Sequence, residues 1–372
     1  MSARTAASTA AITVVGAGPG GLALAGAAAA AGADVRLYDV APAALARLHP
    51  AGRLRLTGVV SAEVAITLAT TDPASAAAGA DLAILAVPPA QIGSAVRAIA
   101  PHLPAGGVIL LAQSYFGGAL VAAAALPDAG AAERIAVAEA AAFPFACSLA
   151  QDGSVHIAAR KRRVPVASLP SGRTAAVVGL ISSFVPGATA SPSVLDTSLS
   201  DVSASIHVPV MVANAGRIEA GSSFDLFAEG FTASAAAMAE GLDAERLDVA
   251  RAVGVKAPSV REWITDTYGV EVPDMRAAGK ALAQVFGPVP APATVRHRYL
   301  TDDVPCLAVP ASELAGLLGL RAPVHHALIE IASVICGEDF RANGRNAELL
   351  GLGGLRGQTV DQICARLTGG ST

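Results

Sequence analysis

The feature that most constrains this chain is the regular alternation, over its first 170 residues, of short aliphatic runs with alanine-rich stretches. In chain order the runs read AITVV, DVRLY, AEVAITL, DLAILAV, GVILLA and RIAVAE. Parallel strands need long crossover connections, usually helices, so the alternation predicts β-α-β units in an α/β, doubly wound, mostly parallel sheet with helices on both faces. Two further runs, SVHIAA and VPVASL, flank a basic segment and predict an added hairpin or meander.

The second half of the chain follows a different pattern. From about residue 196 onward, apolar residues recur every three or four positions, which is the spacing of an amphipathic helix. In AAAMAEGLDAERLDVARAVG, for example, Met238, Leu242 and Leu247 fall on one side, and we expect the acids and arginines to face solvent. An all-helical second domain is therefore predicted.

Two prolines between residues 186 and 196 mark the joint between these patterns, because proline interrupts regular elements. We predict an α/β domain over residues 1–195 and a helical domain over residues 196–372. With 372 residues, of which 53% are apolar and 15% charged, the chain has enough apolar surface for two packed cores. The apolar content of the helical domain leaves a homodimer open.

Charge and hydropathy exclude several classes of partner. The net charge is −4 and the isoelectric point about 6.0, so the chain lacks the basic surface that nucleic-acid binding needs, and we interpret RKRR at 160–163 as a solvated strand end. Proline, glycine or charged residues interrupt every apolar stretch before about 20 strong hydrophobes accumulate, so no membrane-spanning helix is predicted. The lead MSARTAASTA lacks a basic head and a leucine-rich core, which favours a cytoplasmic location.

The four cysteines lie far apart and form no C-x-x-C pair, which argues against a metal site or a disulfide framework. We expect each to be a small core residue. They are Cys147, Cys306, Cys336 and Cys364. Small molecules are the partners that this composition favours.

A glycine-rich turn, GAGPGG, follows the first predicted strand and opens the first predicted helix, matching G-x-G-x-x-G. In this pattern Gly16 permits the tight turn, Gly18 lets a pyrophosphate approach the backbone, and Gly21 lets the helix pack closely on the sheet. The helix that begins at Pro19 and Gly20 presents the free N–H groups of its first turn, other than that of proline, and a positive dipole to phosphates. The turn predicts a dinucleotide site.

Asp39 strengthens this prediction. It lies 18 residues after Gly21, at the end of the second predicted strand, where a carboxylate accepts hydrogen bonds from the ribose hydroxyls of an adenine nucleotide. A carboxylate there also repels a 2′-phosphate, so NAD(H) is favoured. NADP(H) stays open, because Arg36 or Arg53 offers a cation for such a phosphate.

The fourth predicted strand ends in Val87 and Pro88, which we expect to lie under the cofactor, with a purely structural turn as the alternative. A hydride carrier also needs an acid or base near the carbon that it serves. His207 is the candidate among seven histidines, because it begins the helical domain, where a cleft between domains is expected. A hydrogen-bonded structural histidine is the alternative.

A second unusual stretch reads RHRYLTDDVP. Its charged residues Arg296, Arg298, Asp302 and Asp303 are costly to bury unless they meet a ligand or a partner charge. A carboxylate here can hold His207 in one tautomer, and an arginine can clamp a substrate carboxylate. A surface loop joined by salt bridges is the alternative.

Five segments together resemble the opine dehydrogenase family, the octopine and nopaline dehydrogenase group. They are VAEAAAFPFAC, HIAARKRRVPVASLP, HVPVMVANAGRIE, FDLFAEGFTASAAAMAEGLDAERLDVARAVG and RYLTDDVP. The resemblance spans nearly the whole chain. It implies a Rossmann domain joined to an all-helical domain, and NAD(P)H-dependent reductive condensation of an amino group with an α-keto acid.

The resemblance also implies roles for site residues. His207 matches the family's catalytic histidine and Asp303 the aspartate paired with it, while Asp302, where the family often has Glu, is the fallback. Arg298 matches the arginine that holds a substrate carboxylate. The histidine would deprotonate the amine, water would leave to give an imine, and hydride would pass from nicotinamide C4 to the former carbonyl carbon.

Three positions depart from the family pattern. Gln113-Ser114-Tyr115 stands where a Pro-Gly pair is usual, Ser148 where many members have Arg, and Ser203 where Asn is common. The loss of an arginine and an amide predicts a less anionic or differently shaped amine substrate. Gln113, Tyr115 and Ser203 would then contribute hydrogen bonds, with ordinary structure as the alternative for each.

Two other functions stay open from the sequence. One is reduction of a preformed imine or a ketone without condensation, and the other is a nucleotide-binding sensor without turnover. The presence of both His207 and Asp303 argues against the sensor, which needs neither.

Overall fold

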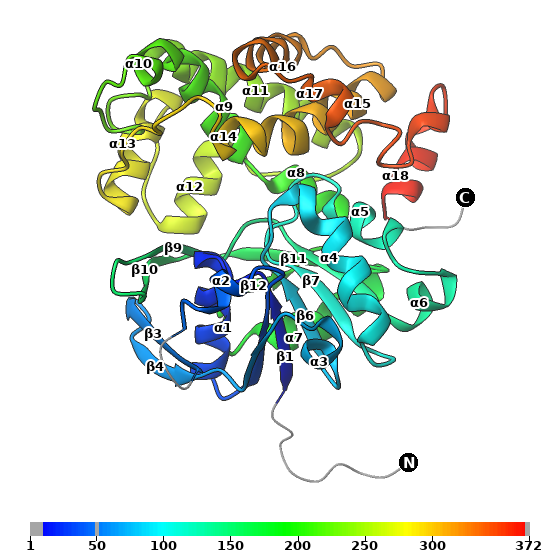
Figure 1. The fold of residues 1–372 in the computed structure, drawn as a ribbon. Coiled ribbons are helices and arrows are strands. Elements are labelled where there is room, and N and C mark those ends of the chain that lie inside the picture. Colours follow the sequence, from blue (N-terminus) through cyan, green and yellow to red (C-terminus); the bar gives the residue numbers. More distant parts are fainter. Residues whose placement is uncertain (1–9, 49–51, 369–372) are drawn as a thin grey trace. The chain divides into compact units, whose positions relative to one another are not determined.

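The computed structural model describes residues 10–48 and 52–368, so most of the lead MSARTAASTA lies outside the described residues. By compactness the chain divides into two units (Figure 1). The first runs to Gln113 and resumes over Val121–Ala190, and the second combines Ser114–Leu120 with the chain from Ser191 onward. The domain boundary between residues 195 and 196 stays a prediction, but residues 114–120 group with the helical part, which no sequence pattern led us to expect.

The core of the first unit is an eight-stranded sheet with the order β12-β11-β8-β7-β6-β1-β2-β5. Every neighbouring pair is parallel except β8 and β11, so the predicted mostly parallel sheet is confirmed. Its strands are β1 (Ala11–Val15), β2 (Asp34–Tyr38), β5 (Leu68–Thr70), β6 (Leu82–Leu85), β7 (Val108–Leu111), β8 (Ala136–Ala140), β11 (Val164–Leu169) and β12 (Ala188–Ala190). The central strands β6 and β7 are buried throughout, which explains their continuous apolar runs.

Seven helices accompany this sheet in the described sequence up to Ile181. They are α1 (Pro19–Ala30), α2 (Pro42–Leu45), α3 (Pro73–Ala77), α4 (Ile92–Ile99), α5 (Gly118–Ala124), α6 (Ala129–Arg134) and α7 (Thr174–Ile181). The helix α5 begins in the segment that groups with the second unit and ends in the first.

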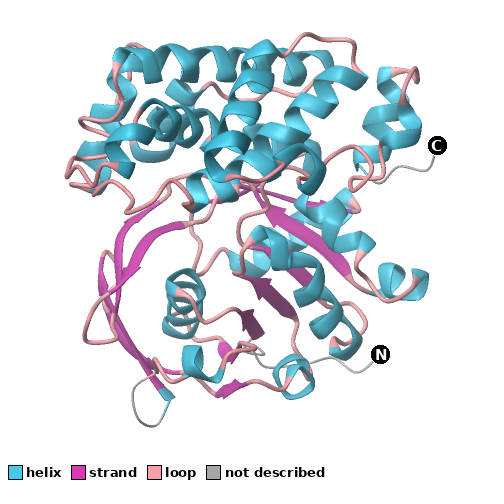
Figure 2. Cartoon of the chain, turned by 45° about the horizontal axis from the view of Figure 1, so that its top comes forward, coloured by secondary structure: helices cyan, strands magenta, loops and turns pink. Residues whose placement is uncertain are grey.

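A second, four-stranded sheet, seen as the curved magenta strands in Figure 2, has the order β4-β3-β10-β9. Its strands are β3 (Arg53–Gly58), β4 (Ala62–Ala65), β9 (Phe145–Leu149) and β10 (Val155–Arg160). The predicted hairpin of SVHIAA with VPVASL is therefore wrong, because β10 pairs with β9 and β3 while β11 joins the large sheet. Both strands place alternate apolar residues in the core, so periodicity alone could not assign them to different sheets.

Helix α1 packs against strands of both sheets, which explains its alanine-rich sequence. Residues 21–28 are all buried. A Cβ at Gly26 would lie 2.7 Å from the Leu56 side chain of β3, so a larger residue there would displace this buried leucine. The alanine run is thus a packing requirement of the first unit, because small side chains let the helix lie between two layers.

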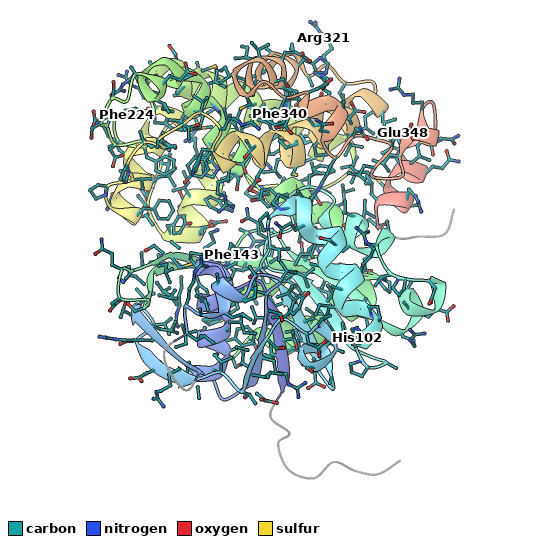
Figure 3. The ribbon with its side chains drawn as sticks, in the orientation of Figure 1. His102, Phe143, Phe224, Arg321, Phe340 and Glu348 are labelled. Carbon is teal, nitrogen blue, oxygen red and sulfur yellow. The ribbon has the colours of Figure 1, made fainter. Side chains whose placement is uncertain are left out.

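The second unit is helical, as predicted (Figure 2). Phe340, labelled in Figure 3, is completely buried in its core. The helices are α8 (Val194–Ser200), α9 (Ser203–Ala213), α10 (Ala215–Glu219), α11 (Ala233–Ala252), α12 (Val260–Tyr268), α13 (Met275–Phe286), α14 (Arg298–Thr301), α15 (Val309–Leu317), α16 (Pro323–Cys336), α17 (Phe340–Asn343) and α18 (Val360–Thr368). A π-helical turn, Val304–Ala308, connects α14 to α15.

Helix α11 corrects one expectation. Its Asp243, Glu245 and Arg246 are buried rather than solvent-facing. The carboxylate of Asp243 accepts a hydrogen bond from the first N–H of α12, and that of Glu245 accepts two from the first turn of α16. These acids satisfy the free donors of neighbouring helix starts, which makes their burial tolerable.

The cysteine prediction holds for Cys306 and Cys336, which are buried, whereas Cys147 and Cys364 are half-buried; all four are free thiols. Within the described ranges, no helix combines the length and the apolar character needed to cross a membrane.

Candidate functional site

The glycine turn between β1 and α1 has the conformation that its sequence requires. Gly16 has a φ of +102°, and a Cβ there would lie 2.6 Å from the carbonyl oxygen of Ala86 at the end of β6. A Cβ at Gly21 would collide with the carbonyl oxygen of Gly16. The need for glycine at position 21 thus arises mainly from the turn itself, rather than from the sheet as we expected.

The middle of the turn fits a pyrophosphate. A Cβ at Gly18 would meet no atom within 4 Å, so this glycine leaves open space that the fold does not need. Pro19 is the first residue of α1, whose first turn carries no acidic residue and presents free N–H groups. A Cβ at Gly20, by contrast, would lie 2.8 Å from the ring of Phe143, which is labelled in Figure 3, so a larger residue there would have to displace that ring.

Asp39 lies beside this turn. Its Oδ2 accepts a hydrogen bond of 2.7 Å from the N–H of Ala17, and its Oδ1 accepts one of 2.8 Å from the N–H of Ala41. These bonds orient the carboxylate while leaving further lone pairs, the arrangement needed to accept ribose hydroxyls.

The arginine nearest the turn is one that sequence reasoning missed. Arg47 donates from Nη1 to the carbonyl oxygen of Ala17 at 3.0 Å. The two arginines that we considered are engaged elsewhere, Arg36 with the carbonyls of Ser75 and Ala78, and Arg53 with Glu63 at 2.6 Å. Arg47 follows the short helix α2, and no motif in the sequence marks it as a residue near the glycine turn.

Val87 and Pro88 follow β6. The Cγ1 atom of Val87 would be 3.2 Å from a Cβ at Gly16, so Val87 borders the glycine turn. Pro88 precedes a short 3₁₀ turn, Pro89–Gln91. The structure places Val87 at the predicted cofactor region and gives Pro88 a local role in the turn.

In the second unit, His207 and Asp303 lie in direct contact. Nδ1 of His207, on α9, is 2.6 Å from Oδ2 of Asp303. The Asp303 side chain is 3% exposed and that of His207 is 21% exposed. Because a carboxylate only accepts, the neutral imidazole carries its hydrogen on Nδ1, and Nε2 is left as a proton acceptor.

Tyr299 completes the setting of the imidazole, and sequence reasoning missed it. Its ring stacks on that of His207, with centroids 3.9 Å apart and planes 18° apart. Tyr299 lies four positions before Asp303, a spacing that puts two residues on one face of a helix. With Asp303 as a candidate, this spacing could have identified Tyr299. His297 packs edge-on against the other side of this group, 4.5 Å from Tyr299, and burial lowers its pKa.

Arg298 has two polar neighbours. Its Nη2 donates to the hydroxyl oxygen of Tyr115 at 2.8 Å, and its Nε lies 3.7 Å from Oδ2 of Asp302. Its side chain is 57% exposed, so the guanidinium is accessible to a ligand. Burial raises the pKa of Asp302 to about 6, although Arg298 opposes the shift. Of the two aspartates, Asp302 lies next to Arg298 and Asp303 contacts His207.

The turn that carries Tyr115 is strained. Tyr115 has a φ of +57° and is the one non-glycine residue with positive φ in the described ranges 10–48 and 52–368. Such a conformation costs about 1–2 kcal/mol for a residue with a Cβ. Burial raises the pKa of its phenol, so the hydroxyl stays protonated. Sequence reasoning gave no reason to expect this conformation.

The remaining predicted substrate residues are distributed over both units. Ser203 is the first residue of α9, four positions before His207 and hence on the same helical face. Gln113 is half-buried and ends the first part of the first unit. Ser148, where the family often has Arg, is exposed on β9.

Known proteins share both halves of this architecture. Residues 190–336 match the family model of the α-helical domain of NAD/NADP octopine/nopaline dehydrogenase, and residues 12–166 match that of ketopantoate reductase PanE/ApbA. An opine dehydrogenase from Arthrobacter sp. (strain 1C) is 32% identical over 343 residues, covering 92% of this chain and 95% of that relative.

Solved structures show the same fold. Octopine dehydrogenase in complex with NADH and agmatine has a TM-score of 0.79 and 22% identity, covering 98% of this chain and 99% of that chain. Yersinopine dehydrogenase with bound NADP⁺ has a TM-score of 0.69 and 18% identity, covering 97% and 98%. Together with the match to the Arthrobacter enzyme, these findings lead to one conclusion: the chain belongs to the opine dehydrogenase family, NAD(P)-dependent oxidoreductases that condense an amine with an α-keto acid by reduction of the imine.

Proposed function

We propose that in this protein His207 is the general base of the condensation and Asp303 the residue that orients it. The observation that carries the proposal is the 2.6 Å contact between Nδ1 of His207 and Oδ2 of the buried Asp303. This contact directs Nε2 away from the carboxylate and stabilises the imidazolium that forms when Nε2 takes a proton. Stacking on Tyr299 holds the plane of the ring.

The amine enters as an ammonium ion, which cannot attack a carbonyl. Nε2 of His207 accepts one of its protons, and the free amine adds to the keto carbon. The imidazolium then returns the proton to the hydroxyl group that leaves as water. Loss of water leaves an iminium ion, in which nitrogen keeps its last proton, and addition of a hydride at carbon gives the secondary amine. The glycine turn at Gly16, Gly18 and Gly21 would hold NAD(P)H, which would supply that hydride when bound.

Arg298 is proposed to hold the carboxylate of the keto acid. Its guanidinium is accessible, and the bond from Nη2 to Tyr115 fixes one side of the fork. An arginine held in this way binds a carboxylate with defined geometry, which orients the neighbouring carbonyl carbon.

For the amine we propose a substrate that is less anionic than those of relatives with Arg at position 148. Ser203 lies one turn from His207 on α9 and offers a hydroxyl, and Gln113 and Tyr115 are the other proposed polar contacts. Structures of octopine dehydrogenase contain L-arginine, agmatine and pyruvate, which makes these compounds the first to test.

The cofactor is proposed to be NADH in preference to NADPH. Support comes from Asp39, whose carboxylate is oriented beside the turn and would repel a 2′-phosphate. Arg47 is the nearby cation through which NADPH would be tolerated. The relatives include both cases, since octopine dehydrogenase is solved with NADH and yersinopine dehydrogenase with NADP⁺.

The experiment mixes the purified protein with NADH, pyruvate and a panel of amines. Loss of NADH absorbance only when keto acid and amine are both present is the expected result. Loss with the ketone alone would indicate simple reduction, and binding of NADH without oxidation would indicate a sensor. Mass spectrometry of the secondary amine identifies the product.

A cytoplasmic location and a homodimer complete the proposal. Cofactor and small-molecule substrates are cytoplasmic metabolites, and the helical unit is rich in apolar residues. Light scattering of the purified protein at micromolar concentration tests the dimer, and cell fractionation tests the location.

A further inference from the structure

The strained turn at Tyr115 is held by one buried arginine from the far end of the sequence. Nη1 of Arg345 donates to the carbonyl oxygen of Ser114 at 2.7 Å and to that of Phe116 at 2.8 Å. The two carbonyls on either side of Tyr115 are thus bound to the same nitrogen atom. Arg345 is 3% exposed, although a guanidinium is costly to bury.

The same arginine is tied to the segment that follows Asp303. The N–H of Arg345 donates to the carbonyl oxygen of Pro305 at 2.8 Å, and the N–H of Phe116 donates to that of Cys306 at 3.0 Å. Both acceptors belong to the π-helical turn Val304–Ala308. Arg345 therefore links the Tyr115 turn to the segment that carries Asp303.

Through Tyr115, this linkage reaches the guanidinium of Arg298. The Tyr115 hydroxyl is the group that accepts the 2.8 Å hydrogen bond from Nη2. We propose that Arg345 and Tyr115 are positioning residues, which hold the Arg298 guanidinium in the orientation that receives the keto acid carboxylate. This inference rests on the proposed role of Arg298.

A purely structural turn would not need this arrangement. Glycine adopts a positive φ without strain, and a phenylalanine would fill the same volume as Tyr115. The chain instead keeps a strained tyrosine whose hydroxyl meets Arg298. It also keeps a buried guanidinium whose Nη2 has no hydrogen-bond partner within the described residues. Both features are costly for stability alone, and the contact of the Tyr115 hydroxyl with Arg298 accounts for a strained tyrosine at this position.

The test is a double-mutant cycle measured as KM for pyruvate. Y115F removes the hydroxyl and keeps the ring, and we expect it to raise KM for pyruvate about tenfold, because a hydrogen bond to a charged group is lost. The value of kcat at saturating pyruvate and Kd for NADH should stay within about twofold. R345M should change KM in the same direction, provided that its melting transition shows a folded protein.

Measuring the effect of Y115F in the R298A variant as well as in the wild type tests whether Tyr115 acts through Arg298. If Tyr115 acts through Arg298, Y115F raises KM for pyruvate in the wild type but not in R298A. An equal increase in both backgrounds, or no increase in the wild type, would overturn the inference. The matched control is Y268F, which removes a phenol hydroxyl from α12 of the same unit and should leave KM for pyruvate unchanged.

Failure of the proposed function looks different. If R298A leaves KM for pyruvate at the wild-type value, the role of Arg298 is wrong, and this inference falls with it. If R298A raises KM and Y115F does not, the proposed function stands and only the positioning role of Tyr115 and Arg345 is lost. Because Y115F leaves the ring in place, the second outcome can be read even if R345M does not fold.

Discussion

The two candidate functional regions of this protein are built in opposite ways. The glycine turn and Asp39 come from one short stretch, residues 16–39, and are ordered by backbone conformation and by hydrogen bonds from nearby backbone N–H groups to the Asp39 carboxylate. The region around His207 draws on four distant segments, which contribute Tyr115, Asp303 and Arg345 among others, and it is held by side-chain hydrogen bonds. One region depends on local backbone conformation and the other on side-chain contacts between distant segments. We therefore expect the two regions to respond differently to mutation.

The largest effect that separates the two regions is expected for H207A. Removal of the general base should lower kcat by about a hundredfold or more, because proton transfer from the ammonium ion is lost. The Kd for NADH, measured by fluorescence titration, should stay at the wild-type value. Exposed His326 provides the control, and H326A should change neither quantity. A parallel loss of NADH binding in H207A would show that the two regions are not separable.

The converse variant is G18A. Because a Cβ at Gly18 meets no atom within 4 Å of the protein, this variant should melt like the wild type. The added methyl group would occupy the space proposed for the pyrophosphate, so Kd for NADH should rise by about thirtyfold. Calorimetry and NADH titration on the same sample check both parts. G21A is the contrast, since its Cβ meets the Gly16 carbonyl and should lower stability as well. Unchanged NADH affinity in G18A would remove the pyrophosphate from this turn.

This contrast explains how much the sequence could predict. The strand–turn–helix with Gly16, Gly18 and Gly21 is recognisable because each glycine answers a local steric need, and the alternation of runs predicted the sheet. The pair His207 and Asp303, 96 positions apart, became a candidate through resemblance and not through spacing.

The features that the sequence could not predict depend on contacts between distant segments. Strands β10 and β11 have the same periodicity and belong to different sheets. The buried acids of α11 look like surface residues until the starts of α12 and α16 are placed against them. Arg345 and Arg47 lie in stretches without any motif, so only the folded chain shows what they bind.

A smaller effect should sharpen the description of the nucleotide region. D39A should shift the ratio of kcat/KM for NADH over NADPH toward NADPH by about tenfold, because ribose hydrogen bonds are lost and repulsion of a 2′-phosphate ends. R47A should shift the same ratio the other way. Initial rates at saturating pyruvate and amine give both values. Arg53, which pairs with Glu63, is the control arginine, and R53A should leave the ratio unchanged. An unmoved ratio in D39A would place the ribose contact elsewhere.

The smallest effect concerns stability in the side-chain region. Burial raises the pKa of Asp302 from 3.8 to about 6, so the fold favours its protonated form. The stability that this form contributes is present below about pH 4 and is lost as the pH rises through 6. Asparagine does not ionise, so D302N should be more stable than the wild type at pH 7.5 by about 1 kcal/mol, after allowance for partial solvent screening.

Urea unfolding at pH 4, 5, 6 and 7.5 measures the free energy difference between D302N and the wild type. We expect the difference to vanish at pH 4 and to grow through pH 6. A flat profile would mean that Arg298 compensates the buried charge fully. In that case Asp302 would be an ordinary salt-bridge partner, and the side-chain region would carry no cost in stability from this carboxylate.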